Sequence, residues 1–282
     1  MTTTRMESLL AAARAGTRTL VMGVLNVTPD SFYDGGTHQD PASAIDHAIR
    51  MLDAGADIVD VGGESTRPGS EPVDAETELA RILPVIERLS ERTNAAISVD
   101  TTKSRVAAAA LAAGAAMVND VSAMTRDPRM AEIVAANGAA ICLMHMRGTP
   151  ATMQALTDYE DVVTEVRSWL SDRVRAAEAA GIPRERIVVD PGFGFAKTVD
   201  QNLELVRRLS EIASLGCPVL LGPSRKSTIG AVLGGLPVHQ RLEGTAAVVA
   251  LAIANGAAIV RVHDVLEMTR VARMTDAIVR TT

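Results

Sequence analysis

Polar and charged residues recur along the sequence at points where short apolar runs end. They comprise carboxylates, amides, basic side chains and histidines: Asn26, Asp60, Glu64, Asp100, Asn119, Asp120, His145, Asp190, Ser224, Arg225, Lys226, Arg261 and His263. One polar residue at a strand end is usually a cap or a loop anchor, but eight such positions in succession are not explained that way. With a net negative chain, any anionic ligand must be held by a few placed Arg and Lys residues such as those in this set.

The apolar runs are predicted to be strands, with helices between them. The first run, residues 20–26, is almost continuously apolar, which is typical of a strand buried on both faces. The stretch at residues 41–54 has apolar residues at helical spacing. Glycines precede the later strands repeatedly: Gly55, Gly114, Gly138, Gly181, Gly216 and Gly256. This alternation predicts βαβ units with parallel strands.

Eight such units in 282 residues predict a single (β/α)8 TIM barrel over residues 20–282, after an N-terminal extension of residues 1–19. An open, doubly wound sheet is the alternative, but no G-x-G-x-x-G motif follows the first strand. The carboxyl ends of barrel strands meet at one rim, so the polar residues are expected to converge there. Pro84, inside the helix expected near residues 75–92, predicts a kink or a break.

Composition narrows the function classes. The net charge is -6 and the pI about 5.4, so no basic surface favours nucleic acid or an anionic membrane. No apolar run approaches the ~18 residues needed to span a bilayer. The N-terminal stretch lacks the hydrophobic region of a signal peptide, so a cytoplasmic location is expected. Cys142 and Cys217 lie in apolar runs, which favours buried, reduced thiols over a disulfide or a metal pair.

The three phenylalanines lie in loop-like stretches, at Phe32, Phe193 and Phe195. Two interpretations have equal weight. The rings either fill gaps beneath loops or stack on a planar ligand.

Eight short sequences occur in a characteristic order: MGVLNVTPDSF, DVGGESTRPG, SVDT, ND, LMHM, DPGFGF, SRKS and RVHD. From about Leu20 to Asp264 the chain therefore resembles the dihydropteroate synthases. That family joins 6-hydroxymethyl-7,8-dihydropterin pyrophosphate to 4-aminobenzoate and releases pyrophosphate, in the step of folate synthesis that sulfonamides block. The resemblance implies a transferase that acts on these two small molecules, uses Mg2+ and forms a homodimer through helices of the outer ring.

The resemblance also implies residue roles. Mg2+ is expected at Asn26. The phosphates are expected near Thr66, Arg67, Arg261, His263 and the backbone of Val262. The pterin is expected to donate hydrogen bonds to Asp190, in a pocket completed by Asn119, Met144, Lys226 and Asp100. The aminobenzoate is expected near Thr66, Pro68, Phe195 and Ser227, under loops at residues 27–37 and 63–74. The groups expected to act on the reaction itself are Asp100, Lys226, Arg261 and His263.

Several residues have a plainer interpretation. Asp60 and Asp120 are expected to hold loops, His145 to be a hydrogen-bonding residue at a strand end, and Lys103 to be part of an ordinary helix start. The chain also departs from the commonest family pattern at three positions, Tyr33, Ala196 and Pro223.

Two other function classes remain open. A pterin-binding methyltransferase domain shares this kind of barrel but has no need for the STRPG loop or for Arg261 with His263. A non-catalytic paralogue that binds pterins is the second.

Overall fold

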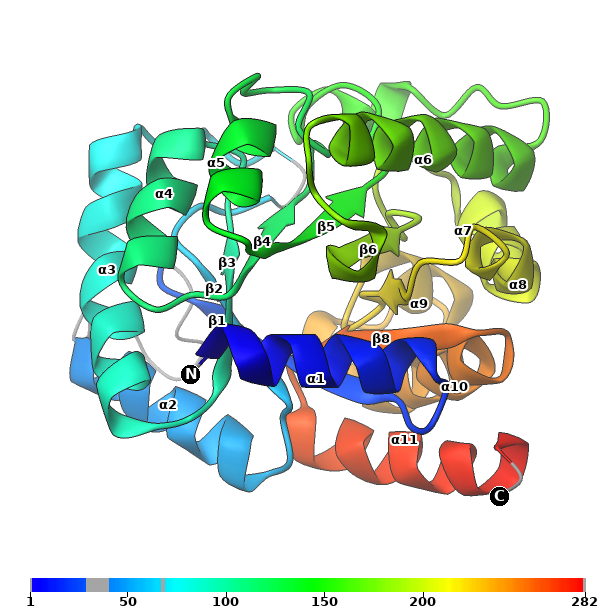
Figure 1. Cartoon of the computed structure of the whole chain (residues 1–282). Helices are drawn as coiled ribbons and strands as arrows, with labels where there is room; N and C mark the ends of the chain where they lie inside the picture. Colours follow the sequence, from blue (N-terminus) through cyan, green and yellow to red (C-terminus); the bar gives the residue numbers. More distant parts are fainter. Residues whose placement is uncertain (1, 29–40, 67–68, 281–282) are drawn as a thin grey trace.

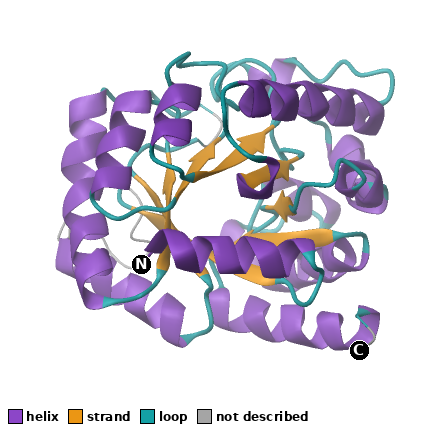
Figure 2. Ribbon diagram, viewed as in Figure 1, coloured by secondary structure: helices purple, strands orange, loops and turns teal. Residues whose placement is uncertain are grey.

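The computed structural model describes residues 2–28, 41–66 and 69–280. Eight parallel strands close into a barrel in chain order. Figure 2 shows the strands at the centre of the molecule with helices outside them. They are β1 (Leu20–Asn26), β2 (Ile58–Gly62), β3 (Ala96–Asp100), β4 (Met117–Asp120), β5 (Ala140–Met144), β6 (Ile187–Asp190), β7 (Val219–Leu221) and β8 (Ala257–Val262). The predicted (β/α)8 barrel is confirmed, and the doubly wound alternative is wrong.

Helices form a ring around this barrel (Figure 1). They are α2 (Pro41–Asp53), α3 (Ala75–Arg92), α4 (Ser104–Ala112), α5 (Met130–Ala136), α6 (Val162–Ala179), α7 (Val199–Arg207), α8 (Leu209–Ala213), α9 (Ser227–Val232), α10 (Leu242–Ala254) and α11 (Val265–Val279). The six glycines noted above all adopt positive φ, between 58° and 116°, a conformation that glycine adopts at helix ends without strain. No described helix is both long and apolar enough to cross a lipid bilayer.

The N-terminal extension contains a helix that the sequence pattern did not reveal. This helix, α1 (Thr2–Arg14), lies across the front of the barrel in Figure 1 and contacts β3 and β8. Its buried side chains pack in one cluster with barrel-interior residues that include Leu20, Ile58 and Ala96 at the starts of strands. These side chains are Met6, Leu9, Leu10 and Ala13. Full burial of an aliphatic side chain contributes about 1.5–3 kcal/mol. The helix therefore closes the end of the barrel opposite the strand carboxyl ends.

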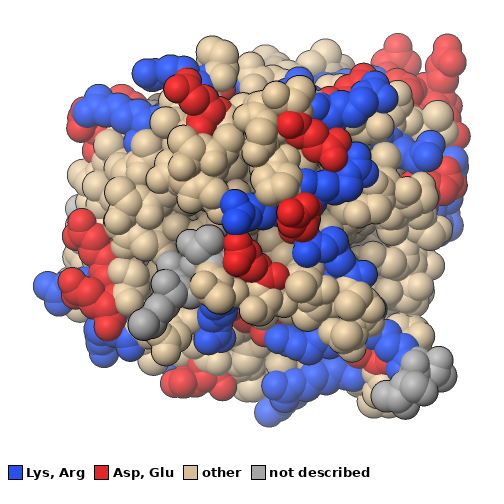
Figure 3. All heavy atoms as spheres, in the orientation of Figure 1, with Lys and Arg blue, Asp and Glu red and all other residues tan. Residues whose placement is uncertain are grey.

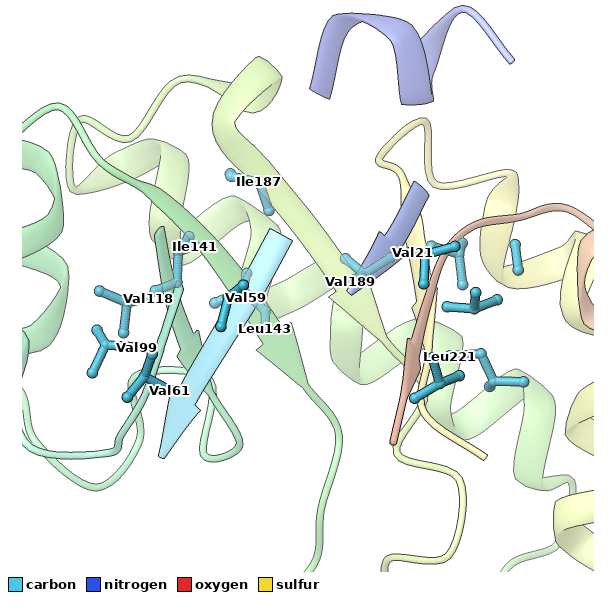
Figure 4. Close-up of a cluster of buried hydrophobic side chains, with 14 of the residues drawn as sticks. Val21, Val59, Val61, Val99, Val118, Ile141, Leu143, Ile187, Val189 and Leu221 are labelled. Atoms are coloured by element: carbon cyan, nitrogen blue, oxygen red, sulfur yellow. The ribbon is translucent and has the colours of Figure 1, made fainter. Parts of the chain in front are cut away.

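Alternating side chains of the strands face two different environments. Val59 and Val61 of β2 belong to the cluster that packs against the outer helices, and Figure 4 shows them with their counterparts on other strands. Ile58 faces the interior cluster closed by α1. Asp60 lies between the two valines and so points inward too. The barrel interior is thus apolar near α1 and charged near the carboxyl ends of the strands.

The barrel closes by pairing its first strand with its last. Leu20 of β1 is in register with Ile259 of β8. Beside this seam, Asp276 of α11 accepts hydrogen bonds from the backbone N–H and Oγ1 of Thr19, both at 2.7 Å. Arg280 Nη1 donates to the carbonyl of Gly16 at 2.7 Å. The segment before β1 is therefore fixed to the end of α11.

A kink or a break was expected at Pro84, and the break is wrong because α3 runs continuously from Ala75 to Arg92. Proline removes one backbone donor, but Ile82, Val85 and Ile86 around it are fully buried. Packing against the barrel therefore outweighs the lost hydrogen bond. The prediction for the cysteines is confirmed, since both are free and buried.

Charges on the molecular surface do not segregate on the face shown in Figure 3. Lys and Arg side chains are interspersed there with Asp and Glu. The charged groups at the rim of the barrel, such as Asp60, Asp100 and Asp190, differ from these surface charges because they are buried.

Candidate active site

Arg261 is held at the rim between two buried carboxylates. It lies on β8, while Asp60 lies on β2 and Asp100 ends β3. Arg261 Nε donates to Asp60 Oδ2 at 2.7 Å, and its Nη2 donates to Asp100 Oδ2 at 2.7 Å. Asp60 is 0% exposed and Asp100 is 7% exposed. Three strands therefore converge on one guanidinium.

The electrostatics of this cluster follow from its burial. Burial is the main cause that raises the pKa of Asp100 to about 7, against the lowering effect of Arg261. Burial would lower the pKa of Arg261, but Asp60 and Asp100 outweigh it and raise that pKa above its usual value. Arg261 is thus a fixed positive charge. Asp100 is a carboxyl group whose charge is easily altered near neutral pH, which is common at reaction centres.

Asp60 belongs to this cluster, and the expectation that it holds a loop is wrong. Asn119 Nδ2 donates to Asp60 Oδ2 at 3.0 Å, so the oxygen bound to Arg261 also binds Asn119. The other oxygen, Oδ1, is buried without a hydrogen-bond partner among the described residues. The period of two along β2 points Asp60 into the barrel rather than toward a loop. This alternation along β2 is the sequence signal that could have placed Asp60 inside the barrel.

Asp190 and Lys226 present further polar groups at the rim. Asp190 ends β6, and its Oδ1 accepts the backbone N–H of Gly192 at 2.7 Å. Burial raises the pKa of Asp190, against the effects of that N–H and of Lys226. Burial lowers the pKa of Lys226 to about 7, against the effect of Asp190. The Lys226 Nζ donates to the carbonyl of Phe193 and lies 4.1 Å from the ring centroid of Phe195.

The two described phenylalanines divide between the two interpretations given above. Phe193 is 1% exposed and packs into the hydrophobic core, so it fills space beneath its loop. Phe195 is half-buried beside Lys226, where its ring can cover a planar ligand. Ala196 follows Phe195 in the sequence and has a φ of 50°. This is a left-handed conformation that glycine would adopt without strain.

Lys197 anchors this loop from beneath, a role that sequence reasoning missed. Its Nζ donates to the carbonyl of Phe195 at 2.9 Å and to that of Gly192 at 3.2 Å. It also lies 3.1 Å from Nδ1 of His145. Burial is the main cause that lowers the pKa of His145 to about 2, so the imidazole is neutral and can accept from Nζ. The prediction that His145 is a hydrogen-bonding residue is confirmed.

Replacing Lys197 with methionine should destabilise the protein and change its pH dependence. Each buried carbonyl that loses its donor costs about 1–3 kcal/mol. Burial lowers the pKa of Lys197 from 10.5 to about 7. Between these values the unfolded chain binds the extra proton, so this group makes the wild type more stable as pH rises. Urea unfolding at about pH 7 and about pH 9 should show the gap between wild type and Lys197→Met widening. A gap that stays constant would contradict this assignment.

The loops after β7 and β8 are joined to each other. His263 follows β8, and its Nδ1 lies 3.0 Å from Oγ of Ser224. Arg225 Nε donates to Asp264 Oδ2 at 3.0 Å, and its Nη2 contacts the second carboxylate oxygen. Val262 is fully buried, and its side chain packs into the cluster beneath the outer helices rather than into the barrel interior.

The remaining predicted residues lie at the edges of this site. Met144 ends β5 and is in register with Asp190, while Ser227 is exposed at the start of α9. Thr66 lines a small cavity together with Glu64 and Asp100. The predictions made for Arg67, Pro68, Phe32, Tyr33 and most of the loop at residues 27–37 fall outside the described residues.

Two side-chain oxygen atoms near the end of β1 bear on the Mg2+ site expected at Asn26. Asn26 Oδ1 and Asp100 Oδ2 lie 3.7 and 3.8 Å from the point that a Cβ on Gly62 would occupy, so both face one place at the rim. In the described part of the chain, no three His, Cys, Asp or Glu residues are grouped as a metal site. Mg2+ usually keeps several waters and takes oxygens from substrate phosphates. The donors present therefore fit an ion that arrives with a phosphorylated substrate.

The fold and its rim define the class of this protein as a (β/α)8 barrel with a cluster of buried charged groups at the carboxyl ends of its strands. Residues 22–263 match the family model described as pterin binding enzyme. A dihydropteroate synthase of Synechocystis is 49% identical over 265 residues, which cover 94% of this chain and 92% of the relative.

Solved structures give the same result. A dihydropteroate synthase from Clostridium difficile, determined in the presence of pteroic acid, has a TM-score of 0.88 and 47% identity, and covers 94% of this chain and 98% of that one. The enzyme from Xanthomonas albilineans, determined with 4-aminobenzoic acid, has a TM-score of 0.88 and 45% identity, and covers 95% of both chains. The chain belongs to the dihydropteroate synthase family.

Proposed function

We propose that this protein condenses 6-hydroxymethyl-7,8-dihydropterin pyrophosphate with 4-aminobenzoate, giving 7,8-dihydropteroate and pyrophosphate for folate synthesis. The observation that carries the proposal is the position of Arg261, held by two buried carboxylates at the rim of the barrel. Family membership and the relatives solved with pteroic acid and 4-aminobenzoic acid support the same two substrates.

The reaction exchanges one bond for another at the pterin methylene. The bond from this carbon to the pyrophosphate oxygen breaks, and its electron pair leaves with the pyrophosphate. The aminobenzoate nitrogen then bonds to the carbon and loses a proton. Positive charge develops on the pterin methylene, while the leaving group gains negative charge. The protein must therefore stabilise charges of opposite sign close together.

Arg261 suits the leaving group because its guanidinium cannot move freely. Its Nε and Nη2 are held by Asp60 and Asp100, and among the described residues no hydrogen bond to Nη1 is present. We assign Nη1 to the pyrophosphate together with His263, the backbone of Val262, Thr66 and Arg67, of which Arg67 lies outside the described residues. The Asp100 carboxylate faces the developing positive charge. The positions of both groups are fixed by their hydrogen bonds before the substrate arrives, so little reorganisation is needed during the reaction.

The pterin is assigned to the residues between β4 and β7. Its ring edge presents adjacent N–H donors, and a buried carboxylate such as Asp190 accepts two of them. Asn119 and Lys226 supply further hydrogen bonds, and Met144 packs against the ring. The aminobenzoate is assigned to the loop side of the site, near Phe195, Thr66, Pro68 and Ser227.

Asn26 is the residue we assign to Mg2+. When bound, the ion would neutralise charge on the pyrophosphate. Adding a chelator should weaken binding of the pyrophosphate substrate but not of the unphosphorylated pterin, and calorimetry can compare the two.

Two measurements on the purified protein test the proposed function. Pyrophosphate release that depends on both substrates would support the synthase and is not expected of a methyltransferase domain. Complementation of a strain that lacks the synthase separates an active enzyme from a non-catalytic paralogue. Failure of both would overturn the proposal.

The order of binding is a further expected outcome. If pyrophosphate and Mg2+ order the loops at residues 27–37 and 63–74, the aminobenzoate lacks a complete site on the free enzyme. Calorimetry should show weak binding of 4-aminobenzoate alone and tighter binding once pyrophosphate and Mg2+ are present. Tight binding without pyrophosphate would rule this order out.

We also propose that the protein is a homodimer formed through α10 and α11. Large apolar side chains are exposed on these two helices, at Leu251, Leu266, Met274, Ile278 and Val279. The helices pack against each other, so their outer faces can form one surface. Sedimentation of the wild type and of Met274→Glu would test this, since a charge within an apolar interface should favour the monomer.

The cytoplasm remains our proposal for its location. Cys142 and Cys217 are free and buried, which suits a reducing compartment. Fractionation of the source cells would test it.

A further inference from the structure

A partly buried ion cluster lies beside the proposed site. Lys103 Nζ contacts Oε2 of Glu64 and lies 2.6 Å from Oε2 of Glu78. The Glu78 side chain is 0% exposed, and Lys103 and Glu64 retain 25% and 17%. Glu64 follows β2, Glu78 lies on α3 and Lys103 immediately precedes α4. One ammonium therefore joins three successive elements of the barrel.

Lys103 lies at a helix start, as expected, but its side chain does not act as an ordinary helix cap. Lys103 is the residue that caps α4, yet its side chain makes no capping hydrogen bond. A positive charge at a helix N-terminus is unfavourable because the helix dipole is positive there. Glu64 and Glu78 outweigh the effect of burial and raise the pKa of Lys103, which keeps it charged. The lysine is thus stabilised by the two glutamates and not by the helix.

The backbone beside Glu64 is fixed as well. Arg81 Nη1 donates to the carbonyl of Gly63 at 2.7 Å. A Cβ on Gly63 would lie 2.8 Å from Ile82 and 3.0 Å from Glu78, so α3 packs directly against this backbone. The segment leaving β2 therefore has a fixed start, and Glu64 is the first side chain that extends from it.

The fixed segment leads to the reacting groups. Glu64, Ser65 and Thr66 line one small cavity with Asp100 and Thr101. Lys103 lies on the same turn as Asp100, and its backbone N–H donates to Oγ1 of Thr101 at 3.2 Å. The Lys103–Glu64 contact thus connects the turn that carries Asp100 with the segment that carries Thr66.

We infer that Lys103 is a positioning residue that holds the Glu64–Thr66 segment opposite Asp100 and so sets the affinity for the aromatic amine substrate. The inference rests on the proposed function, which places that substrate at Thr66. Lys103 itself touches neither substrate and acts only through Glu64. Its loss should therefore affect binding of the amine more than binding of the pterin.

The sharpest test replaces Glu64 with glutamine. This variant keeps the buried Lys103–Glu78 pair, so it should fold, but it loses the charged link to the loop. The KM for 4-aminobenzoate should rise by about tenfold or more, because small displacements of a binding group have large effects. The KM for the pterin substrate should change less than about threefold. Lys103→Met should raise the KM for 4-aminobenzoate further, again with little effect on the pterin substrate. Lys103→Arg should bring this KM part of the way back to the wild-type value.

Arg105→Gln is the matched control. Arg105 of α4 pairs with Glu76 of α3, with side chains 63% and 69% exposed, so it joins the same two helices without contacting the loop. Its kinetics should equal those of the wild type. A fall in melting temperature for Glu64→Gln and Lys103→Met with both KM values unchanged would mean that the cluster is merely structural, and would overturn the inference.

Calorimetry with 4-aminobenzoate in the presence of pyrophosphate and Mg2+ gives a readout that does not need turnover. Weaker binding by Glu64→Gln than by Arg105→Gln supports the inference, and equal binding overturns it. If the wild type neither turns over nor binds the amine, the proposed function fails and the inference fails with it. Normal wild-type behaviour with unaffected variants rejects the inference alone.

Discussion

Replacing Arg261 with methionine should abolish turnover and strongly destabilise the barrel at neutral pH. The substitution removes the charge assigned to the pyrophosphate and leaves Asp60 and Asp100 as neighbouring buried carboxylates. Breaking a buried ion pair by removing one partner costs about 3–5 kcal/mol. The free energy of unfolding, measured in urea at about pH 8, should fall by an amount of this order.

The pH dependence of the same variant identifies the cause. With Arg261 present the pKa of Asp100 is about 7, against a usual value of 3.8, and Arg261 lowers it. Without the arginine this pKa must rise further. The folded variant then binds a proton that the unfolded chain releases, so its stability should fall as pH rises from about 4 through 7 and beyond. At about pH 5 much of the lost stability should return.

A double variant separates folding from chemistry. Asp60→Asn combined with Arg261→Met removes one of the two unpaired charges, so stability at about pH 8 should recover in part. Turnover and binding of the pyrophosphate substrate should not recover. If Arg261→Met alone were as stable as the wild type and bound this substrate normally, the central role of the cluster would be refuted.

Asp190→Asn is expected to remove most of the affinity for the dihydropterin while the protein stays folded. The asparagine Oδ1 can still accept the N–H of Gly192, which holds the loop. The second oxygen becomes an NH2 donor that opposes a donor of the pterin. Losing one partner of a buried, charged hydrogen-bonded pair costs about 2–5 kcal/mol, or roughly 30- to 5,000-fold in affinity. Binding of free pyrophosphate should change little.

Asp120→Asn is the matched control for that variant. Asp120 also ends a buried strand, but its carboxylate accepts from the backbone N–H groups of Ser122 and Met124 and so holds its own loop, as predicted. This variant should have a lower melting temperature and near-normal pterin affinity. The reverse pattern, with Asp190→Asn losing only melting temperature, would show that Asp190 is a loop anchor.

The sequence was sufficient to predict the barrel because each strand is short, apolar and bounded by clear turn signals. It also predicted that Asn119, Asp190 and Arg261 meet at one rim, since all three lie near the ends of such strands. Asp60 was misjudged because its partner, Arg261, is 201 residues away. The Asp60–Arg261 ion pair could be predicted only by combining two facts. Both side chains point into the barrel, and barrel closure brings β8 close to β2, with β1 between them.

The roles of Lys197 and Lys103 could not be predicted for a related reason. Their contacts with His145 and Glu64 span 52 and 39 residues, and each depends on how a loop turns beneath the rim. Helix α1 was missed because TTTRMESLLAAAR buries only a narrow stripe of side chains. A sequence pattern predicts which face of an element is buried more readily than what a long polar side chain reaches.

The seam between the two ends of the fold has a consequence for the order in which the protein is made. β1 pairs with β8, and Thr19 is fixed to Asp276 across 257 residues of sequence. During synthesis β1 emerges first, yet one of its edges has no partner until residues 257–262 have left the ribosome. Closure must therefore follow translation of almost the entire barrel, and the free edge of β1 is open to pairing with other chains during that interval. Chaperone demand should accordingly be greatest late in translation, and variants that weaken the seam should aggregate during synthesis before they show any defect in catalysis.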